Sequence, residues 1–156
     1  MTIRKRMLIT LILTAILLPA ANGAPASFRD IVEQVNPAVV YIEITKQVQS
    51  RFDIWGRRAP QDVTGSGSGV IIDAANGYVL TAAHVIDGVD SATVHLLDGR
   101  KFEAVEFLSD TQTDVGVVKI DIPEGELLPQ VAMGSSEELA VGDWVLAMGS
   151  PLGRAL

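Results

Sequence analysis

The stretch GYVLTAAHVIDG, residues 77–88, decides the fold class. Its first five residues have the length and the β-branched and aromatic content of a strand. Asn76-Gly77 at its start supplies the positive φ that tight hairpin turns need. The strand then leads into His84 and a polar turn, so the stretch indicates an antiparallel β protein with a histidine at a strand end.

The same pattern of strands and turns extends outward along the chain. Short apolar or β-branched runs alternate with turn residues such as Asp98-Gly99. No helical pattern long enough for a parallel crossover lies between the runs, which excludes a doubly wound α/β fold. The spacing predicts an all-β antiparallel barrel or sandwich, with strands over residues 38–45, 69–73, 77–81, 92–97, 101–108, 114–120 and 144–148.

Two segments depart from this pattern. Residues 27–36 have apolar residues at helical spacing, with Ser27 as the expected N-cap and Asn36-Pro37 at the end, so they predict a short amphipathic helix. Residues 46–69 are polar and rich in glycine and arginine, which predicts a long surface loop. The Gly-Ser-Gly-Ser-Gly run at 65–69 has neither the lysine of a phosphate-binding loop nor a serine elbow. It predicts a tight crossing or a bulge where neighbouring backbones come close.

The first 23 residues have the pattern of a signal peptide. Arg4, Lys5 and Arg6 form a basic region, and an apolar run of 12 residues follows from Met7 to Leu18. Small residues beyond it predict cleavage after position 23 or as late as position 26. The alternative is an uncleaved anchor, but a spanning helix needs about 20 apolar residues, so we expect no stable membrane span.

The charge of the chain excludes some classes of partner. The formal net charge is -7, and removal of the three basic residues with the signal peptide makes it -10. An acidic chain lacks the clustered Lys and Arg that bind nucleic acid, so no nucleic-acid partner is expected. The chain has no cysteine, which excludes thiol catalysis and thiolate metal sites. Export without cysteine suits a bacterial periplasm.

The two histidines differ in what they predict. His84 and His95 are eleven residues apart and outside any His-Glu-x-x-His motif, so no metal site and no cofactor are expected. His95 alternates with apolar neighbours along a strand, which predicts a surface or half-buried position on the opposite face. A histidine acting as general base needs a carboxylate on its other ring nitrogen. Asp114 opens an apolar strand 30 residues after His84, and spacing alone leaves a capping role open for it.

Four strings together resemble one known family. GSGSGVIID, GYVLTAAHVIDG, TDVGVVKI and GDWVLAMGSPLG occur in the order and at the separations typical of the HtrA/Deg family of trypsin-like serine proteases. The resemblance covers residues 27 to about 153. It implies that residues 27–156 form the first six-stranded antiparallel barrel of a chymotrypsin/trypsin-like two-barrel fold, preceded by a short N-terminal helix.

The resemblance also implies roles for individual residues. The family's general base maps onto His84 within Thr81-Ala82-Ala83-His84-Val85, and its orienting carboxylate maps onto Asp114. The family often has a small residue two positions after that aspartate, and Gly116 here is a mild departure. Residues 46–64 match a variable loop that takes part in subunit contacts and regulation in relatives. The N-terminal helix matches a segment that helps form trimers. The implied substrates are unfolded or damaged envelope proteins, cleaved in the periplasm by a trimer-based homo-oligomer.

The resemblance leaves one catalytic group unassigned. None of the nine serines lies in the Gly-Asn-Ser-Gly-Gly setting of the family's nucleophile, and no second barrel, oxyanion hole or PDZ domain is expected in this chain. Two hypotheses follow. The chain is the N-terminal part of an exported serine endopeptidase, or it is a catalytically inactive exported module. Such a module would bind unfolded chains or a full-length relative through an exposed apolar face or through the loop that carries Phe52 and Trp55.

Overall fold

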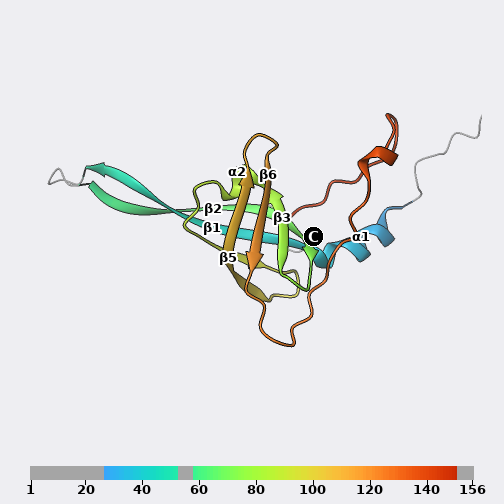
Figure 1. The fold of residues 1–156 in the computed structure, drawn as a ribbon, viewed down its shortest axis with the longest axis horizontal. Coiled ribbons are helices and arrows are strands. Elements are labelled where there is room, and N and C mark those ends of the chain that lie inside the picture. The colour runs from blue at the N-terminus through green and yellow to red at the C-terminus, as the bar shows by residue number, and fades with distance from the viewer. Residues whose placement is uncertain (1–26, 53–57, 151–156) are drawn as a thin grey trace, which may run out of the picture.

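The computed structural model describes residues 27–52 and 58–150. The expected signal peptide lies outside these residues. The strands close into a six-stranded barrel in the order β1-β2-β3-β6-β5-β4, with every neighbouring pair antiparallel (Figure 1). The predicted barrel is confirmed. The strands are β1 (Val39–Phe52), β2 (Arg58–Asp73), β3 (Tyr78–Ala82), β4 (Ser91–His95), β5 (Lys101–Asp110) and β6 (Val115–Ile120).

Alternating apolar residues of these strands fill the barrel. Along β6, Gly116, Val118 and Ile120 are buried while the residues between them are less so, as expected for a strand with one face on a core. The largest fully buried side chains come from five strands and have almost no exposed surface: Val40, Ile42, Ile71, Val79, Val94, Val118 and Ile120. Because the core holds the strands in place, it also fixes the positions of the loops and turns that join their ends.

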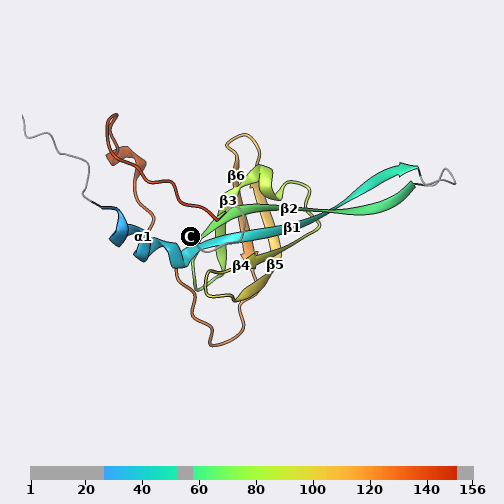
Figure 2. The ribbon, with the colours of Figure 1, turned by 180° about the vertical axis from the view of Figure 1, so that it is seen from behind.

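The first two strands extend beyond the barrel as a two-stranded arm (Figures 1 and 2). Thr45 pairs with Thr64, and the pairing continues through Val48 and Gln61. The surface loop predicted over residues 46–69 is therefore wrong for the paired residues. Residues of the arm such as Gln47 and Val48 are exposed, so this part of the strand has no buried face. Its sequence therefore does not need to alternate apolar and polar side chains, and this alternation is the pattern that predicts a strand.

Short helices lie at both ends of the described chain. The N-terminal helix α1 spans Arg29–Val35 and continues into the 3-10 turn Asn36–Ala38. Phe28 is its N-cap residue, and the Ser27 hydroxyl accepts a hydrogen bond from the Arg29 amide at 3.0 Å, so the helix is confirmed with its cap shifted by one residue. The Phe28 ring lies 6.4 Å from that of Trp144. A second 3-10 turn spans Ser136–Glu138.

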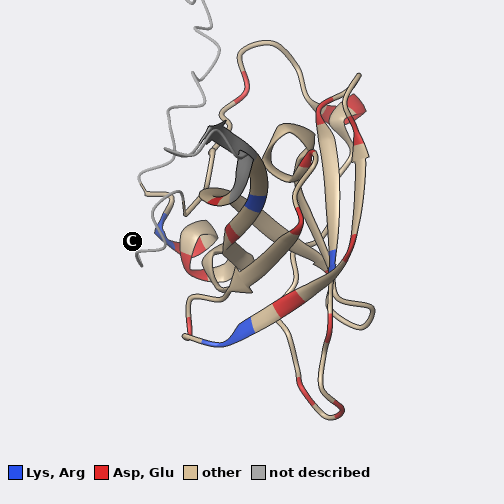
Figure 3. Cartoon of the chain, turned by 90° about the vertical axis from the view of Figure 1, so that its left-hand side faces the viewer, with Lys and Arg blue, Asp and Glu red and all other residues tan. Residues whose placement is uncertain are grey.

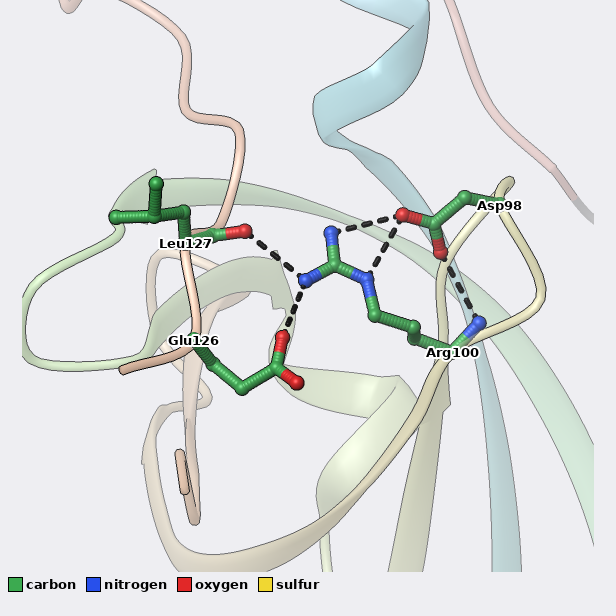
Figure 4. Close-up of polar contacts among 4 residues, drawn as sticks. All are labelled: Asp98, Arg100, Glu126 and Leu127. Atoms are coloured by element: carbon green, nitrogen blue, oxygen red, sulfur yellow. Dashed lines mark hydrogen bonds and ion pairs between the residues drawn. The ribbon is translucent and has the colours of Figure 1, made fainter. Parts of the chain in front are cut away.

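Arg100, in the turn between β4 and β5, binds the segment that follows β6 through hydrogen bonds and ion pairs. Its guanidinium donates to Glu126 Oε2 at 2.7 Å and to the Leu127 carbonyl at 2.9 Å, while Nε donates to Asp98 Oδ2 at 2.8 Å (Figure 4). Farther on, the Val131 amide donates to the Ile71 carbonyl at 3.0 Å. The segment thus follows the barrel surface as far as residue 131.

The last predicted strand is not formed. Residues 144–148, all within the described part, have no strand structure. Trp144 is 63% exposed and Val145 is 74% exposed. The apolar composition of this run predicts a strand, but a strand also needs a paired neighbour, and none of the described strands pairs with it.

Candidate active site

His84 lies on a single helical turn directly after β3. This turn, α2 (Ala83–Ile86), is anchored by Ala83 and Ile86, which are 0% and 3% exposed. Residues three apart lie on one face of a helical turn, so the burial of these two turns His84 outward. The His84 side chain is 72% exposed.

Asp114 immediately precedes β6, in the loop that joins β5 to β6. Thr81 pairs with Gly116 and Ala82 with Val115, so the end of β3 and the start of β6 lie side by side. The Asp114 carbonyl accepts a hydrogen bond from the Ala83 amide at 3.2 Å. The backbone of Asp114 therefore ties the loop to the turn that bears His84.

The carboxylate of Asp114 faces the imidazole of His84. Asp114 Oδ2 lies 2.8 Å from His84 Nδ1, and Oδ1 lies 3.0 Å from the same nitrogen. The His84 amide also donates to Oδ1 at 3.0 Å. The structure thus brings together the two residues that the sequence analysis singled out.

These hydrogen bonds set the charge of Asp114 and the tautomer of His84. The backbone hydrogen bond from His84, and then the contact with its ring, lower the pKa of Asp114 below the ordinary 3.8, so the carboxylate is ionised at neutral pH. An ionised carboxylate can only accept, which places the ring proton on Nδ1. Nε2 is then free to take a proton, the state that a general base requires.

The glycine-rich part of β2, residues 65–69, lets the helical turn that bears His84 pack closely against this strand. A Cβ on Gly67 would lie 2.5 Å from Val85 Cγ1, and one on Gly69 would lie 2.7 Å from Val79 Cγ1. A Cβ on Gly69 would also lie 3.0 Å from the Leu80 carbonyl oxygen, so backbones come close at Gly69, whereas at Gly67 the close neighbour is the Val85 side chain. Between these glycines, the Ser68 carbonyl accepts from Thr81 Oγ1 at 2.8 Å, which joins β2 to the strand that leads to His84.

Two further contacts near the site were not anticipated. Ser68 Oγ accepts a hydrogen bond from the Ser150 amide at 2.8 Å, so the end of the described chain lies against β2. A Cβ on Gly116 would lie 2.9 Å from Ile86 Cδ1 and 3.1 Å from the Ala82 carbonyl oxygen. Gly116 therefore gives α2 room to lie on β6. The sequence indicates this only as a small residue two positions after Asp114.

His95 takes no part in this arrangement. It lies on β4 opposite Tyr41 of β1, with ring centroids 5.3 Å apart, and its side chain is 20% exposed. Its Nε2 lies 3.1 Å from Glu43 Oε2 without an aligned hydrogen bond. Val94 and Leu96 are buried on the other face, so the predicted half-buried strand position is confirmed.

The described residues contain no group of three metal-binding side chains and no helix long and apolar enough to cross a bilayer. Figure 3 shows Asp and Glu spread over strands and loops, with Lys and Arg few and separate.

Comparisons with known proteins identify relatives. The model of the family "Trypsin-like peptidase domain" matches residues 67–156. The chain is 37% identical over 145 residues to the "Periplasmic pH-dependent serine endoprotease DegQ" of Escherichia coli, covering 85% of this chain and 31% of the relative. It is 36% identical over 159 residues to the "Probable periplasmic serine protease do/HhoA-like" of Haemophilus influenzae, covering 87% and 34%.

A solved structure, "HtrA-type protease AlgW with decapeptide", superposes with a TM-score of 0.57 at 34% identity, covering 75% of this chain and 39% of that one. The chain thus spans about a third of the length of the curated relatives described here.

Proposed function

The chain belongs to the HtrA/Deg family of trypsin-like serine proteases, and on this premise we propose that it carries the general base and the orienting carboxylate of a serine endopeptidase. His84 is the base and Asp114 is its partner. The observation that carries the proposal is the 2.8 Å contact between His84 Nδ1 and Asp114 Oδ2, which holds the imidazole in the tautomer that leaves Nε2 free.

In the proposed reaction, a serine hydroxyl attacks the carbonyl carbon of a peptide bond while its proton passes to His84 Nε2. The imidazolium formed is stabilised by the ionised Asp114 carboxylate. The same proton is then delivered to the amine that leaves when the C–N bond breaks. The serine comes from sequence beyond the nine serines of this chain, none of which has the family's Gly-Asn-Ser-Gly-Gly setting.

The proposed substrates are unfolded or damaged proteins of the cell envelope. Two relatives have names that place them in the periplasm, and the first 23 residues here have the pattern of a signal peptide. We therefore place the protein in the periplasm after removal of that segment. A trimer-based homo-oligomer is part of the same proposal.

The reading frame beyond Leu156 gives the first test. The proposal expects a Gly-Asn-Ser-Gly-Gly motif within about one domain's length, and casein cleavage by the encoded protein. His84→Ala in that protein should abolish cleavage, whereas His95→Ala, which changes the other histidine, should preserve it. Cleavage that survives His84→Ala at the wild-type rate would contradict the assignment of the base.

A second candidate function rests on the exposed apolar side chains near the end of the described chain. Leu139, Val141, Trp144 and Val145 are each at least 60% exposed, and such side chains can form a surface for another protein. In this alternative the chain binds unfolded polypeptides without cutting them. A stop codon after Leu156, with soluble protein that binds unfolded casein and is not labelled by a fluorophosphonate, would favour it over the endopeptidase.

A further inference from the structure

Two hairpins of the barrel have loops of the same length, four residues. Asp73 pairs with Tyr78 across the β2–β3 loop, and Asp110 pairs with Val115 across the β5–β6 loop. Each loop thus begins after an aspartate at the end of a strand. The sequences are Asp-Ala-Ala-Asn-Gly over 73–77 and Asp-Thr-Gln-Thr-Asp over 110–114.

The first aspartate holds each loop through similar hydrogen bonds, from backbone amides to Oδ1 and from a side chain to Oδ2. Asp73 Oδ1 accepts from the Ala75 and Asn76 amides at 3.0 Å, and its Oδ2 accepts from the Asn76 side chain at 2.8 Å. In the other loop, Asp110 Oδ1 accepts from the Gln112 amide at 2.9 Å, and Oδ2 accepts from Thr113 Oγ1 at 2.8 Å. Such bonds mimic a backbone turn and fix its shape.

The last residue of each loop has a left-handed backbone. Gly77 has a φ of 73° and Asp114 a φ of 56°, and Asp114 is the one non-glycine residue with positive φ among those the structure describes. Glycine adopts this conformation without strain, whereas a residue with a Cβ does so at a cost. The β2–β3 loop therefore has the residue that its shape favours, and the β5–β6 loop does not.

The carboxylate of Asp114 explains why the β5–β6 loop bears this cost. It lies 2.8 Å from His84 Nδ1 and accepts from the His84 amide, contacts that a glycine could not make. Backbone strain of this kind persists where the surrounding structure holds it in place. Within the loop, the groups that hold its shape are Asp110 and its partners Gln112 and Thr113, while the Asp114 carbonyl accepts from the Ala83 amide outside it.

We propose that Asp110 is a positioning residue for the His84–Asp114 pair, because its carboxylate closes the loop in the shape that aims Asp114 at the imidazole. This inference rests on the proposed function, in which that pair is the catalytic base. Asp110 itself makes no hydrogen bond to His84 among those found in the described residues, so it acts through the backbone of residues 111–114.

Three variants of the chain separate positioning from charge and from general stability. Asp110→Ala removes both the loop contacts and the charge. Asp110→Asn removes the charge but keeps an oxygen for the Gln112 amide and an N–H for Thr113 Oγ1. Asp73→Ala is the matched control, because it removes the same kind of loop contacts from the hairpin that does not bear Asp114.

Two NMR readouts on the labelled chain report on the pair without any protease activity. One is the pKa of the Asp114 carboxyl group, followed by its carbon shift. The other is the nitrogen-shift pattern of His84, which tells whether the ring proton is on Nδ1. Loss of a neighbouring negative charge alone would lower the pKa of Asp114, whereas loss of its hydrogen bonds to His84 raises that pKa toward 3.8, so the two effects have opposite signs.

We expect Asp110→Ala to raise the pKa of Asp114 and to shift part of the His84 population to the Nε2–H tautomer. Asp110→Asn and Asp73→Ala should leave the Nδ1–H tautomer in place. Wild-type values in Asp110→Ala, or equal changes in Asp73→Ala, would overturn the inference. If Asp110→Ala does not fold, Thr113→Val takes its place: a smaller change in the same direction supports the inference, and unchanged values overturn it. The absence of peptidase activity in the completed protein would refute the proposed function and leave these readouts unaffected.

Discussion

The substitution Asp114→Asn tests the central pair most directly. The carboxylate now accepts from the His84 amide at 3.0 Å and lies 2.8 Å from Nδ1. An asparagine has one acceptor oxygen, and the His84 amide can only donate, so that oxygen faces the amide. The NH₂ group then faces Nδ1 and donates to it, which moves the ring proton to Nε2 and leaves no free nitrogen to accept a proton from serine.

The expected loss is large because the wrong tautomer cannot act as a base. The corresponding change in a serine protease triad lowers kcat by about 10⁴, which is about 5.5 kcal/mol of transition-state stabilisation. In the protein encoded by the extended reading frame, casein cleavage should fall by that factor while the fold is retained. In the chain as described, the nitrogen shifts of His84 should change from Nδ1–H to Nε2–H.

The matched control for this prediction is Asp73→Asn, which makes the same chemical change in the β2–β3 loop and should alter neither readout. Wild-type cleavage by Asp114→Asn, or an Nδ1–H tautomer that survives the substitution, would refute the geometry argued for the pair.

Three other predictions concern packing, the segment after β6, and pH. Gly69→Val should destabilise the barrel by about 1–3 kcal/mol in urea unfolding, because a Cβ there would lie 2.7 Å from Val79 Cγ1 and 3.0 Å from the Leu80 carbonyl; an unchanged midpoint would contradict this packing. Arg100→Ala should speed cleavage at Glu126 by a glutamate-specific protease, because it removes the guanidinium contacts to that segment. It should cost less than about 1 kcal/mol of unfolding free energy, and cleavage no faster than in Lys101→Ala would count against the role of Arg100. Hydrogen bonds lower the pKa of Asp73 and of Asp114 below 3.8, from Asn76 in the first case and from the backbone of His84 in the second. Because these pKa values are lower in the folded state, the stability they contribute is present above pH 3.8 and is lost as the pH falls below it. The urea midpoint should therefore drop between pH 5 and pH 3, and a midpoint that rises over this range would show the opposite sign.

The barrel was predictable from the sequence because its six strands contribute apolar residues to one buried core. The arm formed by residues 46–52 and 58–64 was missed because its described side chains are largely exposed and need no such alternation. The run at 144–148 was predicted as a strand for the opposite reason: its composition is that of a buried strand, but composition says nothing of whether a partner strand lies beside it.

The site was predictable only in part. The resemblance to the HtrA/Deg family pointed to His84 and Asp114, whereas spacing alone left a capping role open for Asp114. The structure places the two side chains in contact. The loop that presents Asp114 could not be anticipated in the same way. In the equivalent turn, Gly77 after Asn76 indicates a residue with positive φ. Asp114 also has a positive φ, but it follows Thr113 and is not a glycine, so the sequence gives no sign of this conformation.

Both members of the pair come from one barrel, and the order of the strands explains how. Antiparallel neighbours place the end of β3 beside the start of β6, so residues just outside these two ends meet without help from another domain. The barrel does not bury the pair, since the side chains of His84 and Asp114 are 72% and 55% exposed to solvent. Charges in water interact weakly, and the same pair is worth more where the local dielectric is low. In the proposed endopeptidase, the surface that brings the serine to His84 would therefore also have to cover the pair, so that positioning of the nucleophile and strengthening of the base occur in the same step.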